Sequence, residues 1–270
     1  MRVTGLFVYP IKSCGGVRLE RAAVTRAGLQ HDRRMMVVDA SGRFLSQRTH
    51  PRLGRVSTRL EPGGVRALAP EGEVLLPFDL AERGTGSRAV QVWSDACEGV
   101  PDDEGSRFFQ EVLGLSDVSL VALRPGGERS LNPRFAQPDD RVGYADAYPL
   151  LMMGDASVRD LEGRAGVSLD MRRFRPNVTI EAAPYYEDRL AQFTLGGVRF
   201  RGPKRCDRCV LTTLDPDTQE RGVEPLRTLA QYRRGADGKV YLGMNVIPDG
   251  PGVLAVGDQL SDVREQEPNP

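Results

Sequence analysis

The sequence is short of lysine and histidine. Of its 37 basic residues only three are lysines, Lys12, Lys204 and Lys239, and its two histidines are His31 and His50. A metal site built mainly from histidine is therefore excluded. An enzyme that holds pyridoxal phosphate as a Schiff base needs a lysine, so the scarcity of lysine also argues against that class. Because arginine is the usual cation in this chain, each lysine is a candidate for a specific role.

Cysteine is sparse as well, and long apolar runs are absent. The four cysteines are Cys14, Cys97, Cys206 and Cys209, whose uneven spacing does not fit the disulfide framework of a small secreted protein. No segment approaches the roughly 20 apolar residues of a membrane-spanning helix. The N-terminus also lacks the pattern of a secretory signal. We therefore expect a cytoplasmic protein with reduced thiols and no membrane partner.

The chain has no net charge, since 37 acidic residues balance the 37 basic ones. Binding to nucleic acid through bulk charge needs a surplus of cations, so no nucleic-acid partner is expected. Nucleotide loops are missing too. Lys12-Ser13 lacks the upstream glycines of a Walker A motif, and the glycine pattern at residues 84–89 leads into a strand-like run where a dinucleotide fingerprint needs a helix.

The pattern along the 270 residues predicts an α+β, β-rich protein with two closely joined parts. In the first third, runs of β-branched and aromatic residues alternate with turn residues, which is typical of an antiparallel barrel or sandwich. An apolar stripe predicts a helix at residues 103–114. Further helices are expected at residues 155–165 and from Pro225, since proline suits a first helical turn. A hairpin is expected across Gly196-Gly197. The expected early strands are residues 3–10, 17–25, 33–40, 43–49, 54–61 and 89–93.

The C-x-x-C motif at residues 206–209 is the sharpest local feature. A structural zinc needs four ligands, and the other cysteines and the histidines do not lie at paired spacing. A thioredoxin-like motif opens a helix, whereas residues 210–218 predict a strand and a turn. Neighbouring cations lower a thiolate pKa, and here they are Lys204, Arg205 and Arg208. A redox dithiol, half of a zinc site, an inert pair and a single thiolate ligand to a soft metal all stay open.

Other segments accompany this motif in a specific order. They are YPIKSCGGV at 9–17, HDRRMMVVD at 31–39, DAYP at 146–149, RFRPN at 173–177, LGMNVI at 242–247 and VGDQL at 256–260. Together with C-x-x-C-x-x-T-T-x-D-P-x-T at 206–218, they resemble the MOSC family of molybdenum-cofactor proteins. The resemblance is to the branch with an N-terminal β-barrel half, which includes amidoxime reducing components and bacterial relatives, and it covers residues 2–262.

This resemblance implies the architecture and the site. It implies a MOSC N-terminal β-barrel-like domain over 1–120, packed on a MOSC β-barrel with a few short helices over 121–262, and we expect a frayed tail over 263–270. It also implies that Cys209 is the catalytic residue and the ligand of molybdenum. The residues that it implies for binding the molybdenum cofactor (Mo-molybdopterin) are Lys12, Ser13, Arg33, Asp146, Ala147, Tyr148, Arg175, Asn177, Asp207, Arg208 and Asn245.

The chemistry of these residue types agrees with such a ligand. Arginine and lysine suit a phosphate, and asparagine suits the donors and acceptors of a pterin. Although Arg33 and Arg175 are far apart in sequence, we expect them to meet Lys12 in one cleft. Ala147 and Tyr148 stand where the family often has Thr-Ser, so a hydroxyl donor is lost and only backbone contact is expected there.

By resemblance, the activity is the molybdenum-dependent reduction of N-hydroxylated compounds, such as hydroxylamines and amidoximes, with release of water. No cysteine follows Cys209, so a four-cysteine iron–sulfur cluster has no ligands. A separate flavoprotein, ferredoxin or small cytochrome is therefore expected to supply electrons. One alternative is a MOSC carrier of cofactor or sulfur without reductase activity, which would use a Cys209 persulfide. Another is a zinc-stabilised binding module.

Overall fold

The computed structural model describes residues 1–268, and its largest element is an eight-stranded sheet. The sheet is antiparallel except between β14 and β15, which run parallel. In spatial order its strands are β2 (Val17–Leu19), β1 (Arg2–Val8), β15 (Val178–Glu181), β14 (Leu150–Gly154), β18 (Tyr241–Pro248), β17 (Val198–Asp207), β16 (Leu190–Leu195) and β20 (Ser261–Glu265).

Smaller sheets form the rest of the molecule. One contains β5 (Met35–Val38), β11 (Ser119–Ala122), β10 (Asp95–Asp102) and β9 (Arg88–Val92). A second contains β6 (Ser57–Glu61), β7 (Gly64–Ala69) and β8 (Gly72–Pro77). The remaining pairings join β19 (Gly252–Ala255) to β3 (Arg21–Thr25) and β4 (Gly28–Leu29), and β12 (Arg129–Ser130) to β13 (Arg141–Val142).

The helices are few and short, so the predicted β-rich α+β class is confirmed. The α-helices are α1 (Leu80–Arg83), α2 (Asp103–Leu113), α3 (Asp155–Ala165) and α4 (Leu226–Tyr232). The 3-10 helices are η1 (Pro51–Arg55), η2 (Met171–Arg173), η3 (Tyr186–Arg189) and η4 (Val210–Thr213). Across residues 1–268 we find no helix with the length and apolar character needed to cross a membrane.

Local signals explain why the predicted helices and hairpin form where they do. The Asp102 side chain accepts a hydrogen bond from the Gly105 N–H (2.6 Å) and so caps the start of α2. Gly114 ends that helix in the left-handed region at φ 68°. Gly196 and Gly197 also have positive φ and turn β16 into β17, as predicted. The helices at 103–114 and 155–165 are confirmed, and α4 begins directly after Pro225.

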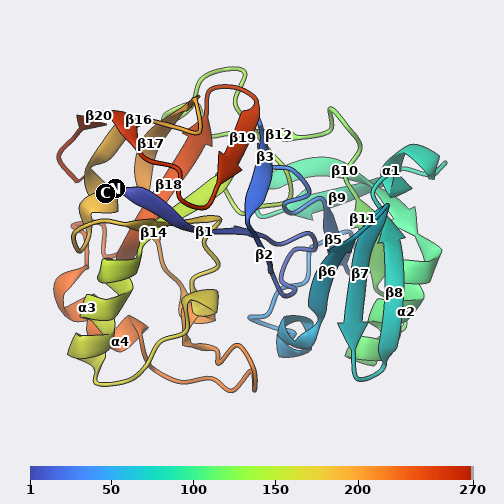
Figure 1. Ribbon diagram of the computed structural model, residues 1–270. Helices are drawn as coiled ribbons and strands as arrows, with labels where there is room; N and C mark the ends of the chain where they lie inside the picture. The colour runs from blue at the N-terminus through green and yellow to red at the C-terminus, as the bar shows by residue number, and fades with distance from the viewer. Residues whose placement is uncertain (269–270) are drawn as a thin grey trace.

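The N-terminal strand ties the two sides of the molecule together. In Figure 1, β6, β7, β8 and α2 lie on one side of the molecule. Strands β14, β16, β17, β18 and β20 of the large sheet lie on the other side with α3 and α4, and β1 and β2 run between the two sides. Strand β1 pairs with β15, and β3 pairs with β19, so segments from both ends of the chain share sheets. The division between residues 120 and 121 stays a prediction.

Two expected strands and the expected tail are wrong. Residues 43–49 form only isolated bridges from Arg43 and Phe44 and then turn, because the Gln47 side chain donates to Ser13 O (2.6 Å) and holds the segment against the loop at 9–16. The first residues of 210–218 form η4, not a strand. Residues 263–265 belong to β20, which pairs with β16, so fraying does not start at 263. Residues 269–270 of that expected tail lie outside the described residues.

The position of β1 in the large sheet leads to a stability prediction. Leu6 is fully buried in the core of that sheet, whereas Leu75 on β8 is 38% exposed. We expect Leu6→Ala to lower the free energy of unfolding by about 2–5 kcal/mol, because it leaves a cavity among buried side chains. Leu75→Ala should change it by less than about 0.5 kcal/mol. Urea unfolding followed by circular dichroism measures both, and equal losses would contradict the assigned core.

Candidate functional site

A cleft of about 680 Å³ brings together all twelve predicted site residues. They come from segments spread along the chain: the loops after β1 and β4, the segment before β14, the turns before β15, the end of β17 and the middle of β18. The expectation that Arg33, Arg175 and Lys12 share one cleft is therefore confirmed as geometry. Their contact with a cofactor stays a prediction.

The backbone is strained at this cleft. Among residues 1–268, eight residues other than glycine have positive φ, and four of them line the cleft, namely Ser13 (69°), Arg33 (44°), Trp93 (56°) and Arg175 (54°). A side chain in this region costs free energy, and such residues concentrate at binding and catalytic sites. The fold therefore holds these four side chains in directions that an unstrained backbone would not give them.

The charge of the lining is strongly positive although the chain as a whole is neutral. Seven lining residues are cationic and two, Asp146 and Asp207, are acidic. No carboxylate within residues 1–268 forms an ion pair with Arg175, whose Nη1 donates to Cys14 O (2.7 Å). Burial lowers the pKa of Arg175, and the nearby Arg33 guanidinium adds to this effect. Such a cleft favours an anionic ligand.

The buried Lys12 forms an ion pair at one wall with Asp146, whose side chain is 55% exposed. The Lys12 Nζ donates to the Asp146 carboxylate and to Tyr144 O (2.8 Å). Burial lowers the pKa of Lys12, while the charge of Asp146 opposes that shift. Burial alone would raise the pKa of Asp146, but Lys12 holds it well below its usual range. The pair fixes residues 146–148 beside the loop that carries Lys12.

Two of the residues predicted to bind the cofactor, Asn177 and Arg208, use their side-chain polar atoms for hydrogen bonds within the protein. The Asn177 side chain accepts from the Leu151 N–H (3.2 Å) and from Arg33 Nη1 (3.1 Å), and donates to Phe7 O (3.1 Å). The Arg208 guanidinium donates to Leu242 O (2.8 Å) and Phe174 O (3.0 Å). Both residues line the cleft, but their polar atoms position neighbouring segments.

Cys209 opens η4 and faces a cation that sequence reasoning missed. The Cys209 Sγ lies 3.4 Å from Arg48 Nη2, which donates to it. The Arg48 guanidinium also lies 4.6 Å from the centre of the Trp93 ring, and Phe44 packs edge-on against Trp93 (5.1 Å). One available signal was that Trp93 is the only tryptophan of the chain. Arg48 gave no signal, because it lies in a run that resembles a strand.

The remaining cysteines differ from Cys209 in their surroundings. All four are free thiols. Burial raises the pKa of Cys206, which also lines the cleft, and raises that of Cys14 to about 12. In the part of the chain that the structure describes, no three His, Cys, Asp or Glu side chains are grouped to hold a metal. A four-ligand zinc site therefore has no ligand set there.

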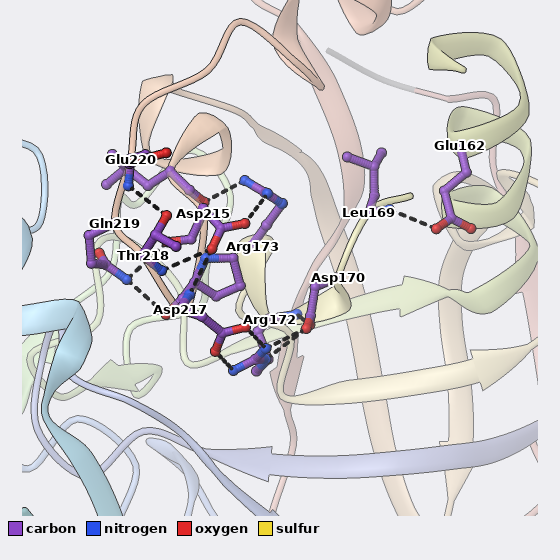
Figure 2. Close-up of polar contacts among 12 residues, drawn as sticks. Glu162, Leu169, Asp170, Arg172, Arg173, Asp215, Asp217, Thr218, Gln219 and Glu220 are labelled. Atoms are coloured by element: carbon purple, nitrogen blue, oxygen red, sulfur yellow. Dashed lines mark hydrogen bonds and ion pairs between the residues drawn. The ribbon is translucent and has the colours of Figure 1, made fainter. Parts of the chain in front are cut away.

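Ion pairs hold the loop that follows Cys209 (Figure 2). Arg172 makes two hydrogen bonds to Asp217 (2.8 and 2.9 Å), and Arg173 bonds Asp215 (2.8 Å) and Leu214 O (2.6 Å). Asp215 also accepts the N–H groups of Asp217 and Thr218, both at 3.0 Å, which lowers its pKa. Arg172, which precedes the RFRPN motif, and Arg173, its first residue, thus anchor the D-P-D-T segment and hold the two motifs side by side.

This anchoring predicts a difference between the two aspartates. Asp215→Ala removes three hydrogen bonds at the half-exposed side of the loop, so the amides of residues 210–221 should exchange with solvent at least tenfold faster. The Asp217 side chain is 70% exposed, so Asp217→Ala should change exchange about threefold or less. Hydrogen–deuterium exchange followed by mass spectrometry measures both variants. Equal effects would show that the loop is held in another way.

Comparisons with known proteins agree over nearly the whole chain. Family models match for the MOSC N-terminal beta barrel domain at residues 1–116 and for the MOSC domain at residues 139–261. Mitochondrial amidoxime-reducing component 1 of Homo sapiens is 30% identical over 280 residues, which cover 96% of this chain and 82% of that protein. The component of the same name from Danio rerio is 34% identical over 277 residues, covering 96% and 83%.

A longer relative matches as well. Molybdenum cofactor sulfurase of Oryza sativa subsp. japonica is 29% identical over 266 residues, which cover 90% of this chain but 32% of that protein. The two family matches and the identity to the amidoxime-reducing components agree with the strand-rich fold. The chain therefore belongs to the family of MOSC-domain proteins that carry an N-terminal MOSC β-barrel domain.

Proposed function

We propose that this protein is a molybdenum-cofactor-dependent reductase of N-hydroxylated compounds. The observation that carries the proposal is the thiol of Cys209 in a cleft with seven cationic side chains and two carboxylates. A soft thiolate is a suitable ligand for a metal of this kind, and the cations suit the phosphate of the cofactor. The names of the amidoxime-reducing relatives supply the reaction type.

The residues of the cleft fit the cofactor in kind. A cleft of about 680 Å³ lies in the usual range for ligand pockets, about 300–1,000 Å³. Lys12, Arg33 and Arg175 all line the cleft, and Arg175 has no ion-pair partner among residues 1–268, so these cations can serve the phosphate. Asn245 and the backbone at 146–148 can serve the pterin. We assign Asn177 and Arg208 to positioning, because their polar atoms already bond the protein.

The proposed reaction is R–NHOH + 2 e⁻ + 2 H⁺ → R–NH₂ + H₂O. When bound, the cofactor supplies the two-electron chemistry, and the chain orients it and shapes the space for substrate. Phe44, Arg48 and Trp93 form the wall opposite the turn that carries Cys209, and Trp93 is 48% exposed. Asp207 lies at the exposed rim between Lys204 (3.7 Å) and Lys239 (3.4 Å), where solvent can deliver protons.

The two cysteines of the C-x-x-C motif test this proposal. Cys209→Ala should abolish reduction of a benzamidoxime substrate and remove bound molybdenum, while the melting temperature stays close to that of the parent. Cys206→Ala is the matched control, since it keeps the proposed ligand, and most of its activity and molybdenum should remain. Metal analysis and product formation with a reduced dye are the measurements.

Other outcomes of the same experiment favour the alternatives. Sulfane sulfur on Cys209 without molybdenum would favour a sulfur-carrier role, which the match to molybdenum cofactor sulfurase makes the second candidate. Equal loss of activity in both variants, together with release of zinc, would favour a zinc-binding module. Full activity of Cys209→Ala would overturn the reductase mechanism.

The source of electrons gives a second test. We propose that a separate flavoprotein, ferredoxin or small cytochrome reduces the site, so purified protein with NADH should not turn over benzamidoxime. A reduced viologen dye should restore turnover. Acidic carriers would meet Arg48, Lys204 and Lys239 near the cleft, so the rate with a protein donor should fall as salt rises. Turnover with NADH alone, or inactivity with dye at full molybdenum content, would contradict the proposal.

A further inference from the structure

A second cavity lies behind one wall of the cleft. Its volume is about 210 Å³, and it shares Arg173, Arg175 and Leu211 with the lining of the cleft. These three residues therefore form the partition between the two spaces. The other walls come from β1 and β2, from the loop at 14–16, from η1 and from the D-P-D-T segment.

Four arginines line this cavity, and no described residue of its lining carries a carboxylate. The arginines are Arg18, Arg172, Arg173 and Arg175. Arg172 is paired with Asp170 and Asp217, and Arg173 is paired with Asp215. Neither Arg18 nor Arg175 forms an ion pair with any carboxylate within residues 1–268. Two guanidinium charges thus have no carboxylate partner, that of Arg18 at the exposed mouth of the cavity and that of Arg175 inside it.

The walls keep the cavity open and otherwise uncharged. A Cβ atom on Gly16 would lie 2.5 Å from the Tyr9 ring, so only glycine lets that ring pack against this backbone. A Cβ atom on Gly54 would lie 2.1 Å from the Gln219 side chain. Burial raises the pKa of Tyr9 to about 12, and its hydroxyl donates to Pro176 O (3.1 Å). Tyr9 therefore supplies no negative charge to offset the arginines.

We propose that this cavity binds a phosphate dianion, as inorganic phosphate or as the phosphate group of a small monoester. A phosphate carries about −1.5 to −2 charges at neutral pH, which matches the two unpaired arginines. Arginine presents a fork of donors that suits such an oxyanion. A water molecule occupies about 30 Å³, so the volume accommodates the anion with part of its hydration shell.

The position of the site gives it a structural effect on the cleft. A phosphate there would contact the segments at 172–175 and 211–219, both of which also build the cleft. It would offset the repulsion between Arg175 and Arg33, whose guanidinium carbons both lie 4.2 Å from the centre of the Tyr9 ring. Phosphate binding would thereby stabilise the folded cleft independently of any cofactor.

Calorimetric titration of the purified, cofactor-free chain with sodium phosphate tests the proposal. We expect saturable binding that Arg18→Gln weakens about tenfold, because one charged hydrogen-bond donor is lost. Arg18 is exposed at the mouth, so the variant should fold, and Arg18→Lys should restore part of the affinity. Lys12→Gln is the control, since Lys12 lines the cleft, where we place the cofactor phosphate, and not this cavity, and the affinity of that variant for phosphate should equal that of the parent.

The fluorescence of Trp93, the only tryptophan of the chain, shows whether phosphate enters the cleft, because Trp93 lines the cleft and not the second cavity. Phosphate in the second cavity should leave its fluorescence unchanged. A parallel titration with glycerol 3-phosphate distinguishes a free ion from a monoester by which of the two binds more tightly. The proposal is overturned if no saturable heat appears up to about 10 mM, ten times a weak Kd of about 1 mM. It is also overturned if Lys12→Gln and not Arg18→Gln removes the binding.

Discussion

The cleft depends on one buried network at the junction of β1, β15 and the loop that carries Arg33. Asp32 is 5% exposed and accepts the Tyr9 N–H (2.7 Å) and Arg33 Nη1 (2.6 Å). Asn177, which is 2% exposed, accepts a hydrogen bond from the same Arg33 guanidinium. Its side chain also bonds the backbone of β1 and of β14. A buried charge is costly unless it is paired in this way. The network therefore fixes how β1 and the loop that carries Arg33 pack against β14 and β15.

The same contacts sustain the strained backbone around the cleft. Arg33 has φ 44°, and both its backbone groups are bonded, the N–H to Tyr9 O and the carbonyl to the Tyr144 N–H, each at 2.9 Å. Arg175 has φ 54° and reaches Cys14 O through its side chain. Strain of this kind persists only where surrounding interactions over-determine the conformation. Because β1 pairs with β15, these two strained turns lie next to each other.

Sequence reasoning found the elements whose signals are local. The helices at 103–114 and 155–165 have apolar stripes and end at glycines with positive φ, and the hairpin at Gly196-Gly197 has its own turn residues. The strand predicted at residues 43–49 was wrong, because the alternation of residue types there resembles a strand while the Gln47 side chain bonds the distant carbonyl of Ser13. The twelve candidate site residues came from motif resemblance. Their division into ligand and positioning residues required the carbonyl groups of distant segments, which no sequence pattern reveals.

The arginines show how a chain without net charge can build a cationic site. Most of the arginines near the cleft have a carboxylate partner, as Arg33 has in Asp32 and Arg173 has in Asp215. Those arginines organise loops, since their charge is already balanced. Arg175 lies inside the molecule without such a partner in the described chain, and it borders both cavities. Burial of an unpaired cation is costly, so its persistence there is most simply explained if an anion completes the structure. The balance between paired and unpaired guanidinium groups, and not the total charge, therefore supports the two anion sites that we propose.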